Sequence, residues 1–436
     1  RRVLFRSVIE PRHEIHGIDV TPWPCISYFA NDEGRPIDVV GDVNGDGFDD
    51  LVFGCRTSGA GNCGYYDGFV SVVSGLDGHW LWKVAGQDFS GESLGYSVSG
   101  AGDWNADGTP DVVAGAPWAD GGEGRVRLYS GVDGALLYSL SNPYPESSNN
   151  CGYSVSGIED LNADGHDEVI VSFRGAGGGS SGRVIVLSGA SGAIRFNLAA
   201  PNPAGLGSYN FGYVVRDGGD VTGDGVHDIL VGHPGARNSA DEQRGAVYVF
   251  SGATGALMHE VFGSVVGSGF GQQVDGVGDQ NADGRDDFIA TGDQQGWGAR
   301  VISGMDASTL WSGGVLTTAS GAGDVNGDGI EDFLVGYPNY TTGGYSGFAR
   351  VIAGGTFATL YTFGYPNAQG RTGSALSRAG DINSDGFADF VVAAGGLGGR
   401  AHVYLGRPAP RELRRIEGSA AGDRVGFAVS GAGDVD

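Results

Sequence analysis

The chain has 436 residues, of which 84 are glycine and 40% are hydrophobic, and its formal net charge is −26. The hydrophobic fraction excludes a wholly disordered chain, and the lack of a strict Gly-X-Y period excludes collagen. Because the 52 acidic residues outnumber the 26 basic ones and no basic run occurs, we expect no nucleic-acid binding. No stretch of about 18 apolar residues is present, so we also expect no membrane insertion by this segment.

The N-terminal part precedes any recognisable pattern. Residues 1–7, RRVLFRS, resemble the translation of a sequencing adapter and are left out of the fold prediction, and residues 8–27 form a lead-in. Cys55 and Cys63 bracket a short glycine-rich loop, which favours a local disulfide in an exported protein and two reduced thiols in a cytosolic one. Cys25 and Cys151 either pair or remain free. No CxxC pair occurs, so a zinc knuckle is not expected.

From residue 41 onward, one motif recurs. Its seven complete copies are GDVNGDGFDDLVFG from Gly41, GDWNADGTPDVVAGAP from Gly102, EDLNADGHDEVIVS from Glu159, GDVTGDGVHDILVG from Gly219, GDQNADGRDDFIATG from Gly278, GDVNGDGIEDFLVG from Gly323 and GDINSDGFADFVVAA from Gly380. An eighth copy begins at Gly433 and stops after Asp436, so we expect a piece of a longer chain, open at both ends. A period of this length indicates a repeat architecture.

Each unit contains four short apolar or alternating runs bounded by glycine, the pattern of β-strands. The second run directly follows the motif, as in DLVFG and DILVG, and the third alternates, as in GRVRLYSG and GAVYVFSG. A single four-stranded sheet cannot bury both of its faces, whereas radial packing of such sheets can. The sequence therefore predicts an all-β fold, a β-propeller of four-stranded antiparallel blades. Seven blades are expected and eight are possible, while the alternative is a linear array of independent β modules.

The expected blade boundaries follow from the repeat. They are residues 28–88 for blade 1, 89–146 for blade 2, 147–208 for blade 3, 209–268 for blade 4, 269–313 for a short blade 5, 314–369 for blade 6, 370–422 for blade 7 and 423–436 for the start of a truncated eighth repeat.

The recurring motif has the form D-x-[N/T]-x-D-G-x-x-[D/E], in which oxygen ligands alternate along the chain. Such a set suits a hard cation, and Ca²⁺ takes six to eight oxygen ligands. Side chains at positions one, three, five and nine and the backbone carbonyl at position seven would bind the ion, and glycine at position six permits the sharp turn. An EF-hand would place its closing glutamate at position twelve between two helices, whereas the flanks here are strands. An Asp-Gly turn without metal would explain the glycine but not the other repeated ligands.

The predicted ligands, one set for each complete repeat, are Asp42, Asn44, Asp46, Phe48 and Asp50; Asp103, Asn105, Asp107, Thr109 and Asp111; Asp160, Asn162, Asp164, His166 and Glu168; Asp220, Thr222, Asp224, Val226 and Asp228; Asp279, Asn281, Asp283, Arg285 and Asp287; Asp324, Asn326, Asp328, Ile330 and Asp332; and Asp381, Asn383, Asp385, Phe387 and Asp389. The sequence thus predicts up to seven Ca²⁺ ions. They would offset about half of the net charge of −26 and relieve repulsion among crowded carboxylates. We expect this metal to be structural and coupled to stability.

The combination of FG or LG, the GDVNGDGxxD loop and the GAP ending resembles the FG-GAP repeat of the seven-bladed integrin α propeller and of large bacterial secreted or surface proteins. Phe211-Gly212 and Phe270-Gly271 fit the FG position, Phe427 fits it in reverse order, and Gly115-Ala116-Pro117 is a full GAP. The fifth unit is short and the sixth lacks the FG pair, which leaves their outer strands or loops open. The resemblance implies calcium loops on one face and a protein or glycan ligand on the opposite face.

The leading functional hypothesis is a non-catalytic, secreted or cell-surface propeller for adhesion or protein interaction. The alternatives are a lectin-like carbohydrate-binding propeller and the propeller part of a polysaccharide lyase or phospholipase. No GxSxG elbow with a convincing partner and no HExxH motif occurs, so no catalytic residue is predicted. His166 and His227 lie inside the loops, where we expect their side chains to point outward into solvent. Aromatic residues such as Trp118, Tyr144 and Tyr340 lie on the loops expected at the ligand face, where they serve as contact residues or pack the blade rims.

Overall fold

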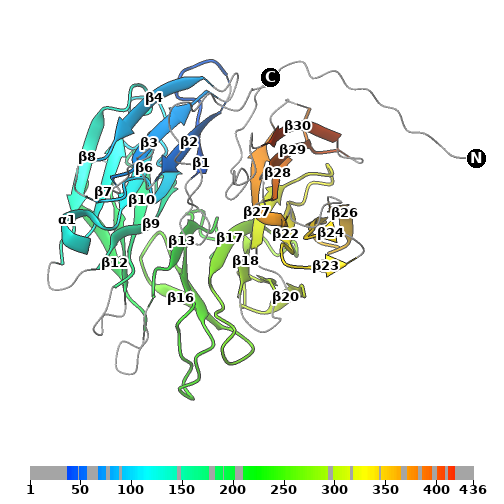
Figure 1. The fold of residues 1–436 in the computed structure, drawn as a ribbon. Helices are drawn as coiled ribbons and strands as arrows, with labels where there is room; N and C mark the ends of the chain where they lie inside the picture. Colours follow the sequence, from blue (N-terminus) through cyan, green and yellow to red (C-terminus); the bar gives the residue numbers. More distant parts are fainter. Residues whose placement is uncertain are drawn as a thin grey trace, which may run out of the picture.

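The computed structural model describes residues 37–47, 49–55, 67–74, 79–87, 91–144, 149–175, 182–189, 191–201, 210–292, 298–314, 318–342, 345–364, 371–381, 385–394, 400–407 and 411–417. These residues form seven four-stranded antiparallel sheets arranged as a β-propeller, with the blades following one another in chain order around the axis (Figure 1). The predicted fold class is confirmed. The short element α1 (Ala119–Gly122) contains three residues with positive φ and is a tight turn rather than a regular helix.

The first four blades each contain four consecutive strands. Blade 1 comprises β1 (Ile37–Gly41), β2 (Asp50–Cys55), β3 (Phe69–Val73) and β4 (Trp80–Ala85), and blade 2 comprises β5 (Ser97–Gly100), β6 (Val112–Ala116), β7 (Arg125–Tyr129) and β8 (Leu136–Ser141). Blade 3 comprises β9 (Cys151–Ile158), β10 (Glu168–Phe173), β11 (Arg183–Leu187) and β12 (Ile194–Leu198), and blade 4 comprises β13 (Val214–Asp217), β14 (Ile229–His233), β15 (Ala246–Phe250) and β16 (Leu257–Phe262).

The last three blades keep the same order. Blade 5 comprises β17 (Gln273–Gly278), β18 (Asp287–Thr291), β19 (Arg300–Ile302) and β20 (Thr309–Ser312). Blade 6 comprises β21 (Thr318–Gly323), β22 (Asp332–Gly336), β25 (Ala349–Ile352) and β26 (Thr359–Phe363), with the small hairpin β23 (Thr341–Thr342) and β24 (Tyr345–Ser346) between its second and third strands. Blade 7 comprises β27 (Thr372–Gly380), β28 (Asp389–Ala394), β29 (Arg400–Leu405) and β30 (Arg411–Glu417). The shorter fifth unit and the sixth unit without an FG pair therefore both keep their outer strands.

The second strand is deeply buried in blades 2 to 7. Strands β6, β10, β14, β18, β22 and β28 are buried along their whole length. Each of these strands lies in the middle of a sheet with neighbouring blades packed on both faces. For this reason they read as continuous apolar runs rather than as alternating patterns.

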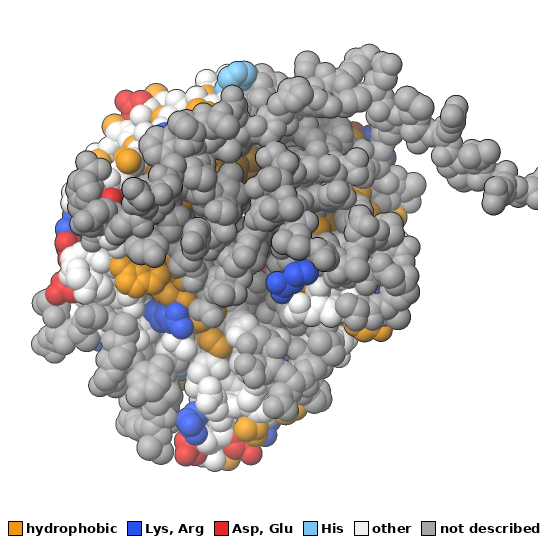
Figure 2. All heavy atoms as spheres, viewed as in Figure 1, with side chains coloured by type: hydrophobic (Ala, Val, Ile, Leu, Met, Phe, Trp, Pro, Cys, Tyr) orange, Lys and Arg blue, Asp and Glu red, His pale blue; other side chains and the backbone are white. Residues whose placement is uncertain are grey.

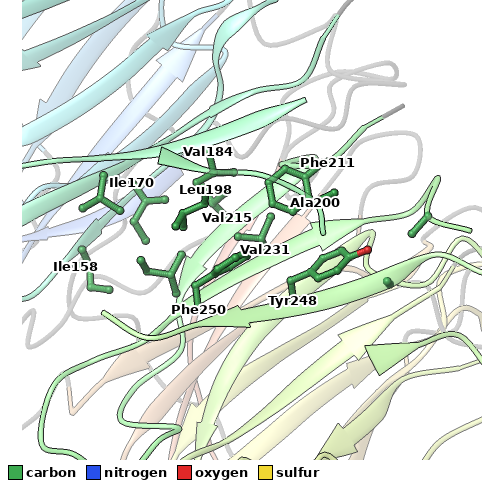
Figure 3. Close-up of a cluster of buried hydrophobic side chains, with 14 of the residues drawn as sticks. Ile158, Ile170, Val184, Leu198, Ala200, Phe211, Val215, Val231, Tyr248 and Phe250 are labelled. Atoms are coloured by element: carbon green, nitrogen blue, oxygen red, sulfur yellow. The ribbon is translucent and has the colours of Figure 1, made fainter. Parts of the chain in front are cut away.

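Hydrophobic side chains fill the spaces between consecutive blades. One cluster joins Ile158, Ile170 and Val184 of blade 3 to Phe211 and Phe250 beside and within blade 4 (Figure 3). Five further clusters occupy the spaces from blades 1 and 2 through blades 6 and 7. In a repeat protein of this kind, stability comes largely from such nearest-neighbour interfaces.

A second inter-blade contact starts from the outer strands. Trp82 Nε1 on β4 donates a hydrogen bond to Gly131 O in the β7–β8 turn of blade 2, at 2.6 Å. The hydroxyl of Tyr138 donates to Gly192 O of blade 3 at 3.0 Å, and that of Tyr361 donates to Arg407 O of blade 7 at 2.6 Å. The outer edge of one blade is thereby tied to the turn of the next.

The first strands of the blades surround a central cavity of about 770 Å³. Its lining is mixed polar and apolar and includes the charged residues Asp38, Asp217, Asp275, Glu331 and Arg378. Arg378 Nη2 lies 3.9 Å from Asp275 Oδ1. Although burial opposes its charge, the surrounding carboxylates raise the pKa of Arg378, so this side chain is a fixed positive charge among acids from other blades. No helix in the described part of the chain has the length and apolarity needed to cross a bilayer.

Candidate metal centres

All seven predicted loops lie at the same place in the fold, between the first and second strands of a blade. The turn between the third and fourth strands lies on the same face, because Gly131 N of the β7–β8 turn donates to Asp111 Oδ1 at 3.2 Å. The predicted ligands Phe48 and Asn383 lie outside the described residues. The remaining predicted residues are placed by the structure, and their contacts define the candidate centres.

The loop of blade 2 shows how the sequence shapes a centre. Asp103 Oδ1 accepts a hydrogen bond from Asp107 N at 2.9 Å, and its Oδ2 accepts one from Gly108 N at 2.9 Å. Asn105 Oδ1 also accepts from Asp107 N, at 2.8 Å. Gly108 has φ +89°, which is costly for other residues. The loop therefore curls around the carboxylate at position one, and the acceptor oxygens at positions one and three face the same backbone groups.

The carboxylate at position nine lies deeper. In the seven loops it is fully buried: Asp50, Asp111, Glu168, Asp228, Asp287, Asp332 and Asp389. In blade 6, Asp332 Oδ2 accepts from Val325 N at 3.0 Å and Oδ1 accepts from Gly354 N at 2.9 Å. Position nine thus joins its own loop to the turn after the third strand, in addition to its predicted role as a ligand.

Burial changes the protonation of these acids. It raises the pKa of Asp111, Asp287 and Asp332 to about 7, although backbone N–H groups partly oppose the shift and the neighbouring loop carboxylates add to it. Burial also raises the pKa of Asp228, to about 6. A cation bound in the loop would favour the ionised form, since an opposite charge stabilises a carboxylate.

The loop of blade 3 brings its three acids closest together. One oxygen each of Asp160, Asp164 and Glu168 lies within 4.8 Å of the others. Among the described residues, the matching acids of the other loops do not approach to this distance. Glutamate is one methylene longer than aspartate, which brings the Glu168 carboxylate nearer the loop, where it accepts from Asn162 Nδ2 at 2.7 Å. Burial opposes ionisation of Asp160, but four backbone N–H groups lower its pKa below the usual value.

The loop of blade 7 differs from the rest. Arg407 Nη2 lies 3.1 Å from Asp385 Oδ2, the carboxylate at position five. The guanidinium comes from the residue that follows the glycine after the third strand. It already supplies a positive charge to a predicted ligand, so it would compete with a cation at this loop.

Two histidine predictions are wrong. His166 and His227 do not point outward into solvent, because each contacts the neighbouring blade. His166 Nδ1 lies 3.1 Å from Trp104 O of blade 2. His227 Nδ1 lies 2.9 Å from Asp217 Oδ2, and its Nε2 lies 3.5 Å from Glu159 Oε2 of blade 3. The hydrogen bond to Asp217 is the main reason that the pKa of His227 rises to about 9.

Sequence reasoning missed the glycine that follows the third strand. Among the described residues, its N–H donates to position nine in five blades, from Gly131, Gly252, Gly304, Gly354 and Gly406. The signal was available, since a Ser-Gly pair ends the third strand of blades 1 to 5. In blade 5 the serine also contacts the loop, with Ser303 Oγ 3.5 Å from Asp283 Oδ2.

The predicted disulfide between Cys55 and Cys63 remains a prediction, because Cys63 lies outside the described residues. Cys25, the possible partner of Cys151, also lies outside them. Cys151 itself is fully buried at the start of β9, and burial raises the pKa of its thiol. A buried neutral thiol is unreactive, so Cys151 has the properties of a core residue.

Comparison with known proteins points to one kind of repeat. Residues 94–129 and 316–352 match the family model of the FG-GAP repeat. The chain is 26% identical over 292 residues to integrin alpha pat-2 of Caenorhabditis elegans, a match covering 56% of this chain and 23% of that protein. It is 30% identical over 206 residues to integrin alpha-5 of Xenopus laevis, covering 44% of this chain and 19% of that protein.

A third relative, integrin alpha-V of Gallus gallus, is 32% identical over 182 residues, or 40% of this chain and 17% of that protein. The matched region thus spans about a fifth of these relatives. Among solved structures, the BBS1N chain in a complex with ARL6DN superposes with a TM-score of 0.53 at 12% identity, covering 84% of this chain and 90% of that chain. At this identity the likeness concerns the fold alone.

Proposed function

Because the chain is an FG-GAP β-propeller similar to those of integrin α subunits, we propose that it is a calcium-binding, non-catalytic interaction module of a secreted or cell-surface protein. Its partner would be a protein that binds the face opposite the metal loops. The similarity to integrin α subunits supports an interaction role over a catalytic one.

One observation carries the calcium part of this proposal: the oxygens of Asp160, Asp164 and Glu168 converge within 4.8 Å. Three carboxylates at this spacing repel one another unless a cation or protons neutralise them. All the donors are oxygen, which favours Ca²⁺ over zinc or copper. When bound, the ion would neutralise the loop carboxylates and cross-link the loop. The residues that hold it would keep the first and second strands of the blade together at this end.

On the opposite face, a partly exposed tryptophan supports a protein-binding role. Trp118 is 38% exposed in the connection between β6 and β7, and its ring contacts Tyr96 edge-to-face at 4.8 Å. Tyr96 is buried and lies 5.1 Å from the buried Tyr153, and Arg174 lies 4.4 Å from the centroid of the Tyr153 ring, so the exposed tryptophan rests on a packed aromatic base. Figure 2 shows arginine or lysine side chains adjoining hydrophobic ones on the face that it views. Tryptophan, tyrosine and arginine are enriched among the residues that dominate protein interfaces.

Calcium binding is tested by equilibrium dialysis and by thermal unfolding in Ca²⁺, Mg²⁺ and EDTA. We expect several bound Ca²⁺ ions per chain and a higher midpoint of unfolding in Ca²⁺ than in EDTA, because ligands of the native state stabilise it by mass action. Asp164→Asn should remove one ion from the stoichiometry. An exposed acid outside the loops, Asp133, provides the matched control when it is changed to asparagine. An unchanged midpoint in EDTA together with no bound calcium would contradict the proposal.

The interaction part is tested with purified candidate receptors and a glycan array. We expect Trp118→Ala to weaken binding of a protein partner while the calcium stoichiometry stays constant. Binding to glycans alone would instead support the lectin-like alternative. Asp133 lies on the metal-loop face, so loss of partner binding in Asp133→Asn would contradict a partner site on the opposite face.

A further inference from the structure

In blades 2 to 7, the residue at position eight of the metal loop lies against the loop of the preceding blade. Position eight is not among the predicted ligands, and its identity varies: Asp49, Pro110, Asp167, His227, Asp286, Glu331 and Ala388. In blades 2, 3, 5, 6 and 7 it packs on the glycine that immediately precedes position one of the previous loop. A β-carbon at Gly102 would lie 2.0 Å from Asp167 Oδ2, and one at Gly219 would lie 2.3 Å from Asp286 Oδ2. The absence of a side chain at these glycines therefore allows the next blade to approach.

Two blade pairs exchange hydrogen bonds at this point. Asp103 N donates to Asp167 Oδ2 at 2.8 Å, and Asp167 N donates to Asp103 O at 3.4 Å. Asp220 N donates to Asp286 Oδ2 at 2.8 Å, and Asp286 N donates to Asp220 O at 3.0 Å. Each carboxylate thus holds the backbone of position one in the neighbouring blade.

Other blade pairs show which half of this exchange is optional. In blades 6 and 7, Ala388 N donates to Asp324 O at 2.8 Å, but alanine has no carboxylate to accept in return. In blades 3 and 4 the preceding residue is Glu159 instead of glycine, and position eight is His227, whose Nε2 lies 3.5 Å from Glu159 Oε2. Where the glycine is replaced by Glu159, position eight of the next loop is thus a histidine that reaches the glutamate.

Position one is where the loop is organised. The carboxylate of Asp103 accepts from Asp107 N and Gly108 N, so its direction sets the curl of the whole loop. A charged acceptor on Asp103 N fixes the peptide plane from which this side chain extends. A hydrogen bond to a charged group is stronger than one between neutral groups.

We propose that Asp167 and Asp286 are positioning residues for metal binding by the preceding blade, so that the loops of blades 2 and 4 reach full affinity only when the next blade is docked. This inference rests on the proposed calcium binding. It assigns the two acids to their neighbour's centre, and not to the loop in which they occur.

Trp104 makes the blade 2 loop separately observable. Its side chain is buried at position two, between Asp103 and Asn105. Tb³⁺ is a hard cation that takes oxygen ligands as Ca²⁺ does, and tryptophan excitation sensitises its emission at short range. Because Trp104 O also lies 3.1 Å from His166 Nδ1 of the blade 3 loop, the part of the difference in emission between the chain and its Trp104→Phe variant that persists in Asp164→Asn reports the blade 2 loop. Displacement of that emission by Ca²⁺ gives the affinity of the same loop.

We expect Asp167→Ala to weaken Ca²⁺ binding at the blade 2 loop by about tenfold, the effect of losing one hydrogen bond to a charged group. Asp167→Asn should restore most of the affinity, because its amide oxygen still accepts from Asp103 N. Asp164→Asn, which disables the blade 3 loop itself, should leave the blade 2 signal unchanged. Asp133→Ala controls for the removal of one negative charge on this face.

The outcomes separate the two claims. If the parent chain gives no Trp104-dependent, calcium-displaceable emission, both the proposed calcium binding at this loop and the inference fail. If the parent binds and Asp167→Ala binds equally well, the inference fails and calcium binding stands. A purely structural role would lower the unfolding midpoint of Asp167→Ala equally in Ca²⁺ and in EDTA, which also overturns it.

A variant that adds the carboxylate, instead of removing it, tests the proposal without destabilising the chain. Ala388→Asp adds the missing carboxylate where the backbone half of the exchange already exists. We expect it to increase the calcium-induced rise in the unfolding midpoint, with Ala388→Asn giving a smaller increase of the same sign. A smaller calcium-induced rise than in the parent chain would contradict the proposal.

Discussion

Substitution of two glycines of the blade 2 loop tests how much the contact between neighbouring loops contributes to stability. Gly102 has φ +60° and Gly108 has φ +89°, so replacement of either by alanine forces a left-handed backbone on a residue with a side chain. That conformation costs roughly 1–2 kcal/mol. The two sites differ in space, because the new β-carbon at Gly102 would lie 2.0 Å from Asp167 Oδ2, whereas nothing lies within 4 Å of the one at Gly108.

The difference sets the expected magnitude. The new methyl group of Gly102→Ala would also lie 2.6 Å from Asp167 Cγ and 2.7 Å from its Cβ, so rotation of the carboxylate alone does not make room and the two loops must separate. The cost then includes the lost hydrogen bond from Asp103 N, about 1.5–3 kcal/mol for a charged acceptor. We therefore expect Gly102→Ala to lower the free energy of unfolding by at least about 2.5 kcal/mol, and Gly108→Ala by about 1–2 kcal/mol.

Urea denaturation followed by circular dichroism measures both variants, in Ca²⁺ and in EDTA. The double variant of Gly102→Ala with Asp167→Ala provides a further check, because the two changes remove the same hydrogen bond and should not add. Equal losses for Gly102→Ala and Gly108→Ala, or full additivity in the double variant, would refute the reasoning.

Three further predictions concern other contacts. Trp82→Phe removes the hydrogen bond between blades 1 and 2 and should lower the free energy of unfolding by about 1–3 kcal/mol in urea denaturation. Trp80→Phe, on the exposed side of the same strand, should change it by less than about 0.5 kcal/mol. Equal effects of the two changes would contradict a stabilising role for the Trp82 hydrogen bond. Arg407→Gln removes the competing positive charge and should strengthen cation binding by the blade 7 loop in calorimetry, while weaker binding would show that the arginine helps. In EDTA, the raised pKa of His227 stabilises the fold fully below pH 6.5, and this contribution is lost as the pH rises toward about 9. His227→Gln should therefore flatten the decline of the unfolding midpoint over this window, and an unchanged profile would count against the ion pair with Asp217.

The repeat in the sequence was sufficient to predict the fold. Seven copies of one motif, each followed by an apolar run such as DILVG, indicated seven four-stranded blades, because a single such sheet cannot bury both of its faces. The same repetition located the loops, since each one joins the first and second strands of its blade.

Contacts between blades could not be predicted in this way. The exchange between Asp103 and Asp167, and the bond from Trp82 to Gly131, join residues of different repeats, and their geometry depends on how the blades are rotated around the axis. His166 and His227 were assigned to solvent because a single loop was considered without the blade beside it. The convergence of Asp160, Asp164 and Glu168 likewise depends on the depth at which Glu168 is buried, which the motif alone does not specify.

The sharing of each hydrophobic cluster by two consecutive blades also has a consequence for synthesis. The blades follow the ring in the order in which they leave the ribosome, so every new blade covers the apolar face of the one just completed. At about 5–20 residues per second, such a face waits for several seconds before its cover emerges. Aggregation during translation is thereby confined to the two ends of the growing row of blades, and a stalled ribosome would leave only the first and the last blade uncovered on one face.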